Sequence, residues 1–355
     1  MRLVWSTVTG VLSAESGIQR LALDPLPDPD AAAGAICYPR LTGACVAGDR
    51  VLLNTTAVDM ALGTGGWHFV VAREDAAGLD QPSGGQVMKL RYTPLQTDVL
   101  TAEEKDPASH AVMAEATDLC EMPVVCCGLH SQMAPAAAAC KAARPDARVA
   151  YVMTDAASLP LPLSDLVRAC RAAGLLDATV SCGQAFGGEV EAVTLHSGLL
   201  AARHLMAADV AIVANGPGVT GTGTPYGHGG IAQADAINAA GALGGRPVAA
   251  LRLSFADERA RHRGVSHHTL GVLGTLALAP ALVAVPPLAP EQTRVVEAAL
   301  EDAGVWLRHE RADAVESVPD MRGVVVRSMG RSPDQDPAFF AAAAAAGEVA
   351  ARLLA

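Results

Sequence analysis

Four residues able to move protons lie directly after apolar runs of the sequence or at the start of a helix: His130, Asp155, His267 and His268. Imidazole is the side chain best suited to proton transfer or metal binding near neutral pH, and a carboxylate at the end of a strand suits a general base. Ser266 can cap a helix that begins with His267, and the positive end of a helix dipole disfavours an imidazolium ion. We therefore take these four residues as catalytic candidates, with packing or loop stabilisation as the alternative for each.

A segment rich in glycine and threonine, residues 215–230, follows another apolar run. Its glycines free the backbone to turn N–H groups toward an anion, and its threonines add hydroxyl donors. The sequence therefore predicts that this loop binds a phosphate or a carboxylate, with a purely structural glycine loop as the alternative. Two hydroxyl residues at the ends of other apolar runs, Ser131 and Thr154, are also predicted to bind the ligand. The full set of predicted ligand-binding residues is Ser131, Thr154, Gly216, Gly218, Thr220, Gly221, Thr222, Gly223 and Thr224.

Cofactor signals are weak. Residues 216–221 match the three spaced glycines of a dinucleotide site, but Pro225 delays the following helix. The nearest suitable acidic residue, Asp257, lies farther away than the spacing of about 20 residues that such a site requires. A metal centre using His267, His268, His130 or Asp155 is an alternative without supporting local spacing, so we assign no metal ligands and leave the cofactor unknown. The eight cysteines lack zinc-ligand spacing and are interpreted as small buried side chains in a reducing compartment.

The pattern of apolar runs divides the chain. Residues 1–100 alternate in the manner of short strands, which predicts a small β-barrel or sandwich domain. Residues 101–123 read as a hinge and a short helix. Residues 124–355 alternate apolar runs with Ala-rich stretches, which predicts an α/β domain with a mostly parallel, Rossmann-like sheet and flanking helices. The strands expected in this domain are 124–128, 148–153, 178–181, 210–214, 247–253, 281–285, 305–309 and 323–328.

Charge and hydropathy exclude several classes of protein. The 26 Lys and Arg are outnumbered by 37 Asp and Glu, giving a formal net charge of −11, and no basic run occurs, which argues against nucleic acid or an anionic membrane as partner. No stretch approaches the roughly 20 apolar residues of a membrane span, and residues 1–11 alternate rather than forming a signal peptide. We expect a cytoplasmic protein, and its apolar content and Ala-rich helices are compatible with a homodimer.

Six segments resemble a bacterial family known as domain of unknown function 3866, over essentially the whole chain. They are residues 48–56, 63–69, 129–131, 151–155, 216–224 and 264–269. The resemblance carries no activity, ligand or catalytic residue with it. The chain departs from the family pattern at His228, where an aromatic or apolar residue is expected, so His228 is not counted among the catalytic candidates.

The sequence predicts an enzyme that acts on a small anionic molecule, phosphorylated or carboxylated, at the carboxyl edge of the parallel sheet. The alternative is a non-catalytic metabolite sensor or assembly protein. The residues alone do not decide between the two, and a third possibility, an oxidoreductase, requires a bound nicotinamide or flavin.

Overall fold

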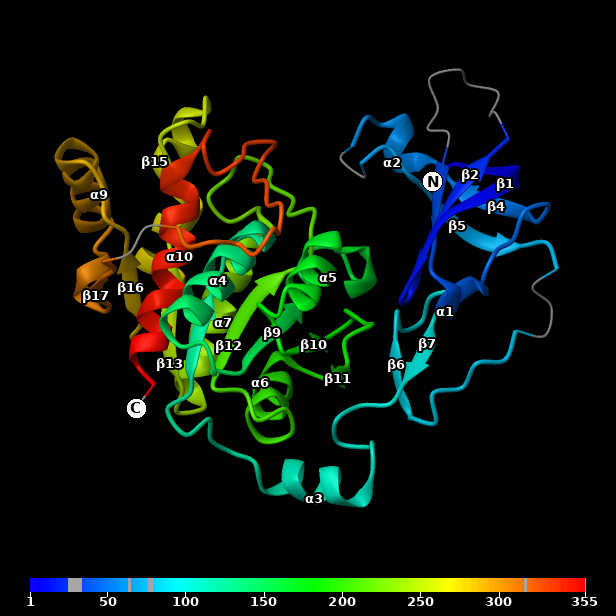
Figure 1. Cartoon of the computed structure of the whole chain (residues 1–355), viewed down its shortest axis with the longest axis horizontal. Helices are drawn as coiled ribbons and strands as arrows, with labels where there is room; N and C mark the ends of the chain where they lie inside the picture. Colours follow the sequence, from blue (N-terminus) through cyan, green and yellow to red (C-terminus); the bar gives the residue numbers. More distant parts are fainter. Residues whose placement is uncertain (25–33, 63–64, 76–78, 316–317, 355) are drawn as a thin grey trace. The chain divides into compact units, whose positions relative to one another are not determined.

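The computed structural model describes residues 1–24, 34–62, 65–75, 79–315 and 318–354. Residues 63 and 64 of the segment 63–69 singled out above lie outside these ranges. The chain divides into two compact units, Met1–Leu100 and Thr101–Ala355 (Figure 1).

The first unit is a closed five-stranded barrel, which confirms the expected small β domain and selects the barrel over the sandwich. Strands pair in the order β1-β2-β3-β5-β4 and β1 pairs with β4 to close the ring. The alternation of Ile18–Leu23 places Leu21 and Leu23 in the barrel core with Val8 and Val51. The strands of this unit are β1 (Leu3–Glu15), β2 (Ile18–Leu23), β3 (Gly34–Cys37), β4 (Arg50–Asn54), β5 (His68–Arg73) and a separate hairpin of β6 (Val87–Lys89) and β7 (Thr97–Val99). Its short helices are α1 (Pro39–Thr42) and α2 (Thr56–Asp59).

The second unit is built on an eight-stranded sheet in which every neighbouring pair is parallel, as the sequence predicts. The strand order is β11-β10-β9-β12-β8-β13-β16-β17. The central strands are buried along their whole length because helices cover both faces of the sheet. The strands are β8 (Pro123–Cys126), β9 (Val149–Thr154), β10 (Ala178–Cys182), β11 (Val190–Ala192), β12 (Val210–Asn215), β13 (Arg246–Ala250), β16 (Leu282–Val285) and β17 (Glu310–Asp313).

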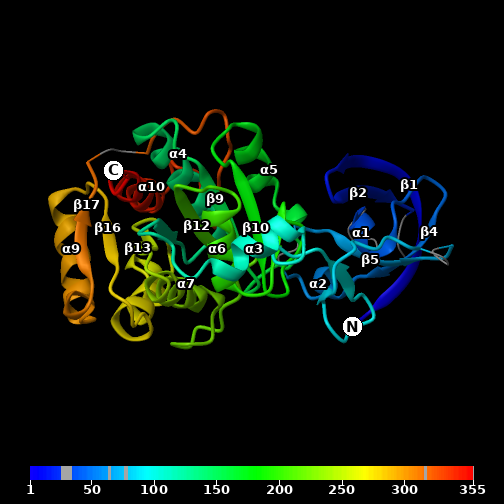
Figure 2. The ribbon, with the colours of Figure 1, turned by 90° about the horizontal axis from the view of Figure 1, so that it is seen from below.

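Two layers of helices enclose this sheet. Figure 2 shows α4, α5 and α10 on one face and α6 and α7 on the other, and two separate hydrophobic clusters correspond to these layers. Two of the helix starts follow from local sequence, since Ser164 Oγ accepts from Val167 N at the start of α5 and Pro290 opens α9. The helices are α3 (Pro107–Glu115), α4 (Met133–Ala143), α5 (Asp165–Ala172), α6 (Leu195–His204), α7 (Ala232–Ala242), α8 (His267–Gly271), α9 (Pro290–Asp302) and α10 (Pro337–Arg352).

Two expected strands are wrong. Residues 305–309 begin with a 3-10 helix, η6 (Val305–Leu307), because Gly304 adopts a left-handed conformation that reverses the chain, and the strand follows as β17. Residues 323–328 alternate in burial as a strand would, with Val325 exposed between buried Val324 and Val326, but they pair with no strand of the described sheet. The alternation of buried and exposed side chains in this segment therefore results from packing against a hydrophobic cluster and not from pairing with another strand.

Within the described ranges, no helix combines the length and the apolar character required to cross a membrane.

Candidate functional site

A change of direction in the sheet marks where a ligand would bind. After β8 the chain builds β9, β10 and β11 on one side, returns to β12, and continues with β13 on the other side of β8. Ligands of open parallel sheets bind beyond the carboxyl ends of the strands at such a point. The segments that follow β8, β12 and β13 contain His130, the glycine-threonine loop (residues 215–230) and Arg252.

The ring of His130, in the 3-10 helix η1 (His130–Gln132), is hydrogen bonded at both nitrogens. Nδ1 lies 3.0 Å from the carbonyl oxygen of Asn215 and 3.2 Å from Tyr151 Oη, and Nε2 lies 2.7 Å from Ser164 Oγ. Since the carbonyl can only accept, Nδ1 donates to it and Nε2 accepts from the serine. Burial lowers the pKa of His130 to about 4, so the ring is neutral. Proton transfer through His130 would have to break one of these bonds.

The other residues predicted near the ends of β8 and β9 brace the neighbouring loops. Asp155 accepts from the backbone N–H of Gln184 at 2.8 Å. Thr154 Oγ1 donates to Asn215 Oδ1 at 2.6 Å, and Asn215 in turn donates to the carbonyl of Gly229 at 2.8 Å. Ser131 Oγ donates to the hydroxyl of another serine, Ser328, at 3.1 Å. Thr154 therefore helps to hold the glycine-threonine loop in place.

The glycine-threonine loop folds back on itself as an exposed turn. Thr222 Oγ1 lies 2.9 Å from Thr224 Oγ1, and both hydroxyls also bond Gly227, so these two side chains hold the turn together. Gly218 and Gly223 have φ values of +87° and +78°, which side-chain-bearing residues rarely adopt. The remaining predicted loop residues are Gly216, Thr220 and Gly221, of which Gly221 forms an antiparallel bridge with His228.

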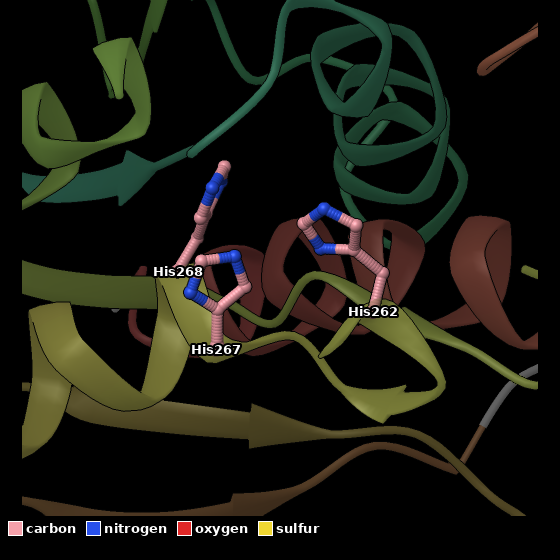
Figure 3. Close-up of side chains that lie close together, drawn as sticks. All are labelled: His262, His267 and His268. Atoms are coloured by element: carbon pink, nitrogen blue, oxygen red, sulfur yellow. The ribbon is translucent and has the colours of Figure 1, made fainter. Parts of the chain in front are cut away.

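The loop places the imidazole of His228 beside those of His267 and His268, and these two rings also contact His262 (Figure 3 shows His262, His267 and His268). The rings of His228 and His268 are parallel with centroids 3.5 Å apart, and His267 lies 4.4 Å from His268. The His262 ring lies 5.0 Å from both His267 and His268. We refer to these four residues as the histidine cluster. It contains two of the four predicted catalytic residues, and none of the ring contacts described for it involves His130.

A small hairpin assembles the histidine cluster. β14 (Leu253–Ser254) pairs with β15 (Gly264–Val265), and the turn between them carries His262 in the 3-10 helix η4 (Ala260–His262). Ser266 then caps α8, as predicted, by accepting from the N–H of His268 at 3.3 Å. The sequence analysis did not identify His262, because this residue lies among arginines that are typical of a surface turn. The two-residue strands on either side of it are too short to produce a recognisable alternation of apolar and polar residues.

Arg252 is a buried cation at the edge of this cluster. Its guanidinium donates to His268 Nδ1 at 3.0 Å, the residue is 8% exposed, and it forms no ion pair with any carboxylate in the part of the chain that the structure describes. The nearby carboxylate of Asp257 instead pairs with Arg259 at 2.7 Å and with Arg331 at 3.3 Å. Burial, followed by the neighbouring arginines, lowers the pKa of Arg252 to about 10, so it stays charged at neutral pH.

The same environment keeps the imidazoles neutral. Burial, then contact with His228 and Arg252, lowers the pKa of His268 to about 2, and burial with Arg252 lowers that of His262 to about 3. The pKa values of His228 and His267 are lowered as well, mainly by burial. Two enclosed nitrogens, His228 Nδ1 and His267 Nε2, have no hydrogen-bond partner among the described residues. The site thus combines one buried positive charge, neutral rings and unused nitrogens.

A cavity of about 660 Å³ lies elsewhere, at the amino ends of the strands. Pro123 and Arg246, which begin β8 and β13, line it together with Cys120 and Arg203. None of the residues predicted to act on or bind a ligand is among its lining residues.

Helices on both faces of an all-parallel sheet, with polar residues gathered where the strand order changes direction, define an open, Rossmann-like α/β protein. Over residues 34–347 the chain matches the model of the family described as protein of unknown function (DUF3866), and it belongs to that family. The resemblance inferred from the six sequence segments is thereby confirmed. No curated protein and no solved structure matches the chain.

Proposed function

We propose that this protein is an enzyme that binds a small anionic molecule, phosphorylated or carboxylated, through Arg252 at the carboxyl edge of the parallel sheet. The observation that carries the proposal is the burial of this guanidinium without a carboxylate partner among the described residues. A bacterial cytoplasm is the proposed setting, and the proposed partner is the small anion.

The charge of buried Arg252 is not compensated by a direct ion pair among the described residues. Removing an ion from water costs several kcal/mol even after the protein relaxes, and a neutral imidazole acceptor returns only part of that cost. Asp257 favours the charged form of Arg252 at longer range, but its carboxylate pairs directly with Arg259 and Arg331 and not with Arg252. An anion bearing two or three oxygens would pair with the planar guanidinium, which suits bidentate recognition of carboxylates and phosphates.

The imidazoles beside Arg252 supply the proposed chemistry. Neutral rings can accept a proton from a bound substrate or donate an N–H to it, and the unpartnered Nδ1 of His228 and Nε2 of His267 support that role. His267 and His268 remain the proposed proton-transfer residues of this cluster. His130 and Asp155, engaged with Asn215 and Gln184, enter the proposal as groups that position the surrounding loops.

Gly230 and Gly221 offer two ways of closing the proposed site. A Cβ on Gly230 would lie 3.1 Å from His228 Nδ1 and 3.5 Å from His268 Nδ1, and a Cβ on Gly221 would lie 3.5 Å from His228 Cβ. Neither glycine has a positive φ, so larger side chains fill space there without backbone strain. Gly230→Ala and Gly221→Val should therefore exclude a ligand while keeping the fold.

The test is thermal stabilisation of the full chain by a panel of phosphate- and carboxylate-bearing metabolites. A ligand present at one hundred times its dissociation constant should stabilise the wild type by about 2.7 kcal/mol. We expect Gly230→Ala and Gly221→Val to lose most of that stabilisation, and the matched control Gly10→Ala, where no atom lies within 4 Å of the new Cβ, to keep it. Equal stabilisation of all four proteins would end the proposal of a site here.

Turnover distinguishes the enzyme from the alternative. A stabilising ligand should be chemically changed by the wild type, and His267→Ala should abolish the change while retaining binding. A ligand that binds and is recovered unaltered would instead identify a non-catalytic sensor.

A further inference from the structure

Three imidazoles of the histidine cluster lie close enough to share one cation. The potential ligand nitrogens of His262, His267 and His268 all lie within 4.8 Å of one another. Figure 3 shows the ring of His262 facing those of His267 and His268 from a neighbouring segment of the chain. Nitrogens bound to one zinc ion at about 2.0–2.1 Å in a tetrahedron stand roughly 3.4 Å apart. Side-chain rotations that move these ring nitrogens by about an ångström would therefore bring all three within coordination distance of one ion.

Two independent observations point to a cation within this group. The Nε2 atom of His267 is enclosed and finds no hydrogen-bond partner within the described ranges, which is costly for a polar atom unless something binds it. The Nδ1 atom of His262 lies 2.7 Å from Ser266 Oγ. When Nδ1 donates to that hydroxyl, the lone pair of His262 Nε2 is free, which is the arrangement that orients a metal-bound imidazole.

We propose that His262, His267 and His268 bind one divalent transition-metal cation of the zinc class, with a fourth coordination position left open. Neutral imidazole nitrogens are ligands that Zn²⁺, Co²⁺ and Ni²⁺ share, and no carboxylate or thiolate belongs to the group to favour a harder or softer ion. Three protein ligands with an open position are typical of catalytic rather than structural zinc. This inference goes beyond the proposed anion site, because the cation can bind whether or not Arg252 holds an anion.

Arg252 and the cation compete for His268. The guanidinium donates to Nδ1, which places the proton of the neutral ring on Nε2. His268 therefore enters the coordination sphere only when the ring releases Arg252 or turns. Removing the charge of Arg252 should then leave metal affinity unchanged or raise it, since a like charge no longer opposes the cation.

The test is calorimetric titration of Zn²⁺ into the full chain after treatment with a chelator. We expect one Zn²⁺ per chain, and an affinity lower by at least about tenfold in His262→Asn and in His267→Ala. The amide of His262→Asn keeps a donor toward Ser266 and removes the Nε2 ligand, so it changes coordination with little effect on the hairpin. His196→Ala, which removes an exposed imidazole from α6, is the matched control and should bind as the wild type does.

Co²⁺ absorption in the visible range provides a second measurement that does not depend on activity. The wild type should show the intense bands of a four- or five-coordinate site, and His262→Asn should lack them. Failure of the wild type to bind one Zn²⁺, or unchanged binding by both His262→Asn and His267→Ala, would overturn the proposal.

Two variants distinguish the proposed metal site from the proposed anion site. Arg252→Met should lose inorganic phosphate and keep Zn²⁺, whereas His262→Asn should lose Zn²⁺ and keep phosphate measured without metal. Loss of Zn²⁺ binding in Arg252→Met would mean that the cation enters only with an anion, and would overturn a metal site built from the three imidazoles alone.

Discussion

Protonation of His130 should destabilise the fold over a defined pH range. The ring pKa falls from its ordinary value of 6.5 to about 4 because the side chain is buried, so the unfolded chain takes up this proton at a higher pH than the folded chain does. Stability from this group is therefore fully present above about pH 6.5 and is lost as the pH falls toward 4. A difference of about 2.5 pKa units at 1.36 kcal/mol each amounts to about 3 kcal/mol.

The measurement is urea unfolding of wild type and His130→Asn at pH 7 and at pH 4. The asparagine amide keeps a donor toward the carbonyl of Asn215 and does not titrate, so the comparison isolates the imidazole from the other buried histidines. The advantage of wild type over the variant should shrink by about 3 kcal/mol between the two pH values. A difference that stays constant within about 0.5 kcal/mol would refute the reasoning.

Two further predictions concern the framework that positions the site. A Cβ on Gly347 would stand against the carbonyl oxygen of Ala136, where α10 packs on α4. In urea titrations, Gly347→Ala should therefore lower the free energy of unfolding by about 1–3 kcal/mol. The control Gly10→Ala, which has open space around the new Cβ, should change this free energy by less than about 1 kcal/mol. Brief proteolysis should cut first near the boundary between Leu100 and Thr101 and leave a stable fragment that begins close to residue 101, because residues 101–123 contribute to the core of the second unit. First cuts inside residues 124–253 would count against that boundary.

The fold class could be predicted from the sequence because short apolar runs bounded by Gly and Pro identify strands buried on both faces. β9 and β12 show this most clearly, since every residue of each is buried. Strand order could not be predicted, because it depends on which side each connection crosses, and β12 returns to lie between β9 and β8. The prediction of a strand at 305–309 was wrong because a three-residue apolar run is also compatible with a single 3-10 turn after Gly304.

The candidate site was only partly predictable. His267 and His268 stand directly after the capping Ser266, a signal that local sequence carries. Arg252 and His262 carry no such signal, because an arginine after a strand and a histidine among arginines look like surface residues. Only the burial of both side chains, produced by the β14–β15 hairpin, reveals them.

The most direct test of the proposed anion site is calorimetric titration of inorganic phosphate into the chelator-treated full chain. We predict one phosphate per chain for the wild type, at least about tenfold weaker binding by Arg252→Met, which corresponds to about 1.4 kcal/mol, and near wild-type binding by Arg261→Met, whose arginine is exposed. The free Arg252→Met protein should unfold at or above the wild-type temperature, because removing a buried unpaired charge offsets the lost hydrogen bond to His268. Absence of phosphate binding by the wild type, or equal binding by wild type and Arg252→Met, would contradict the account.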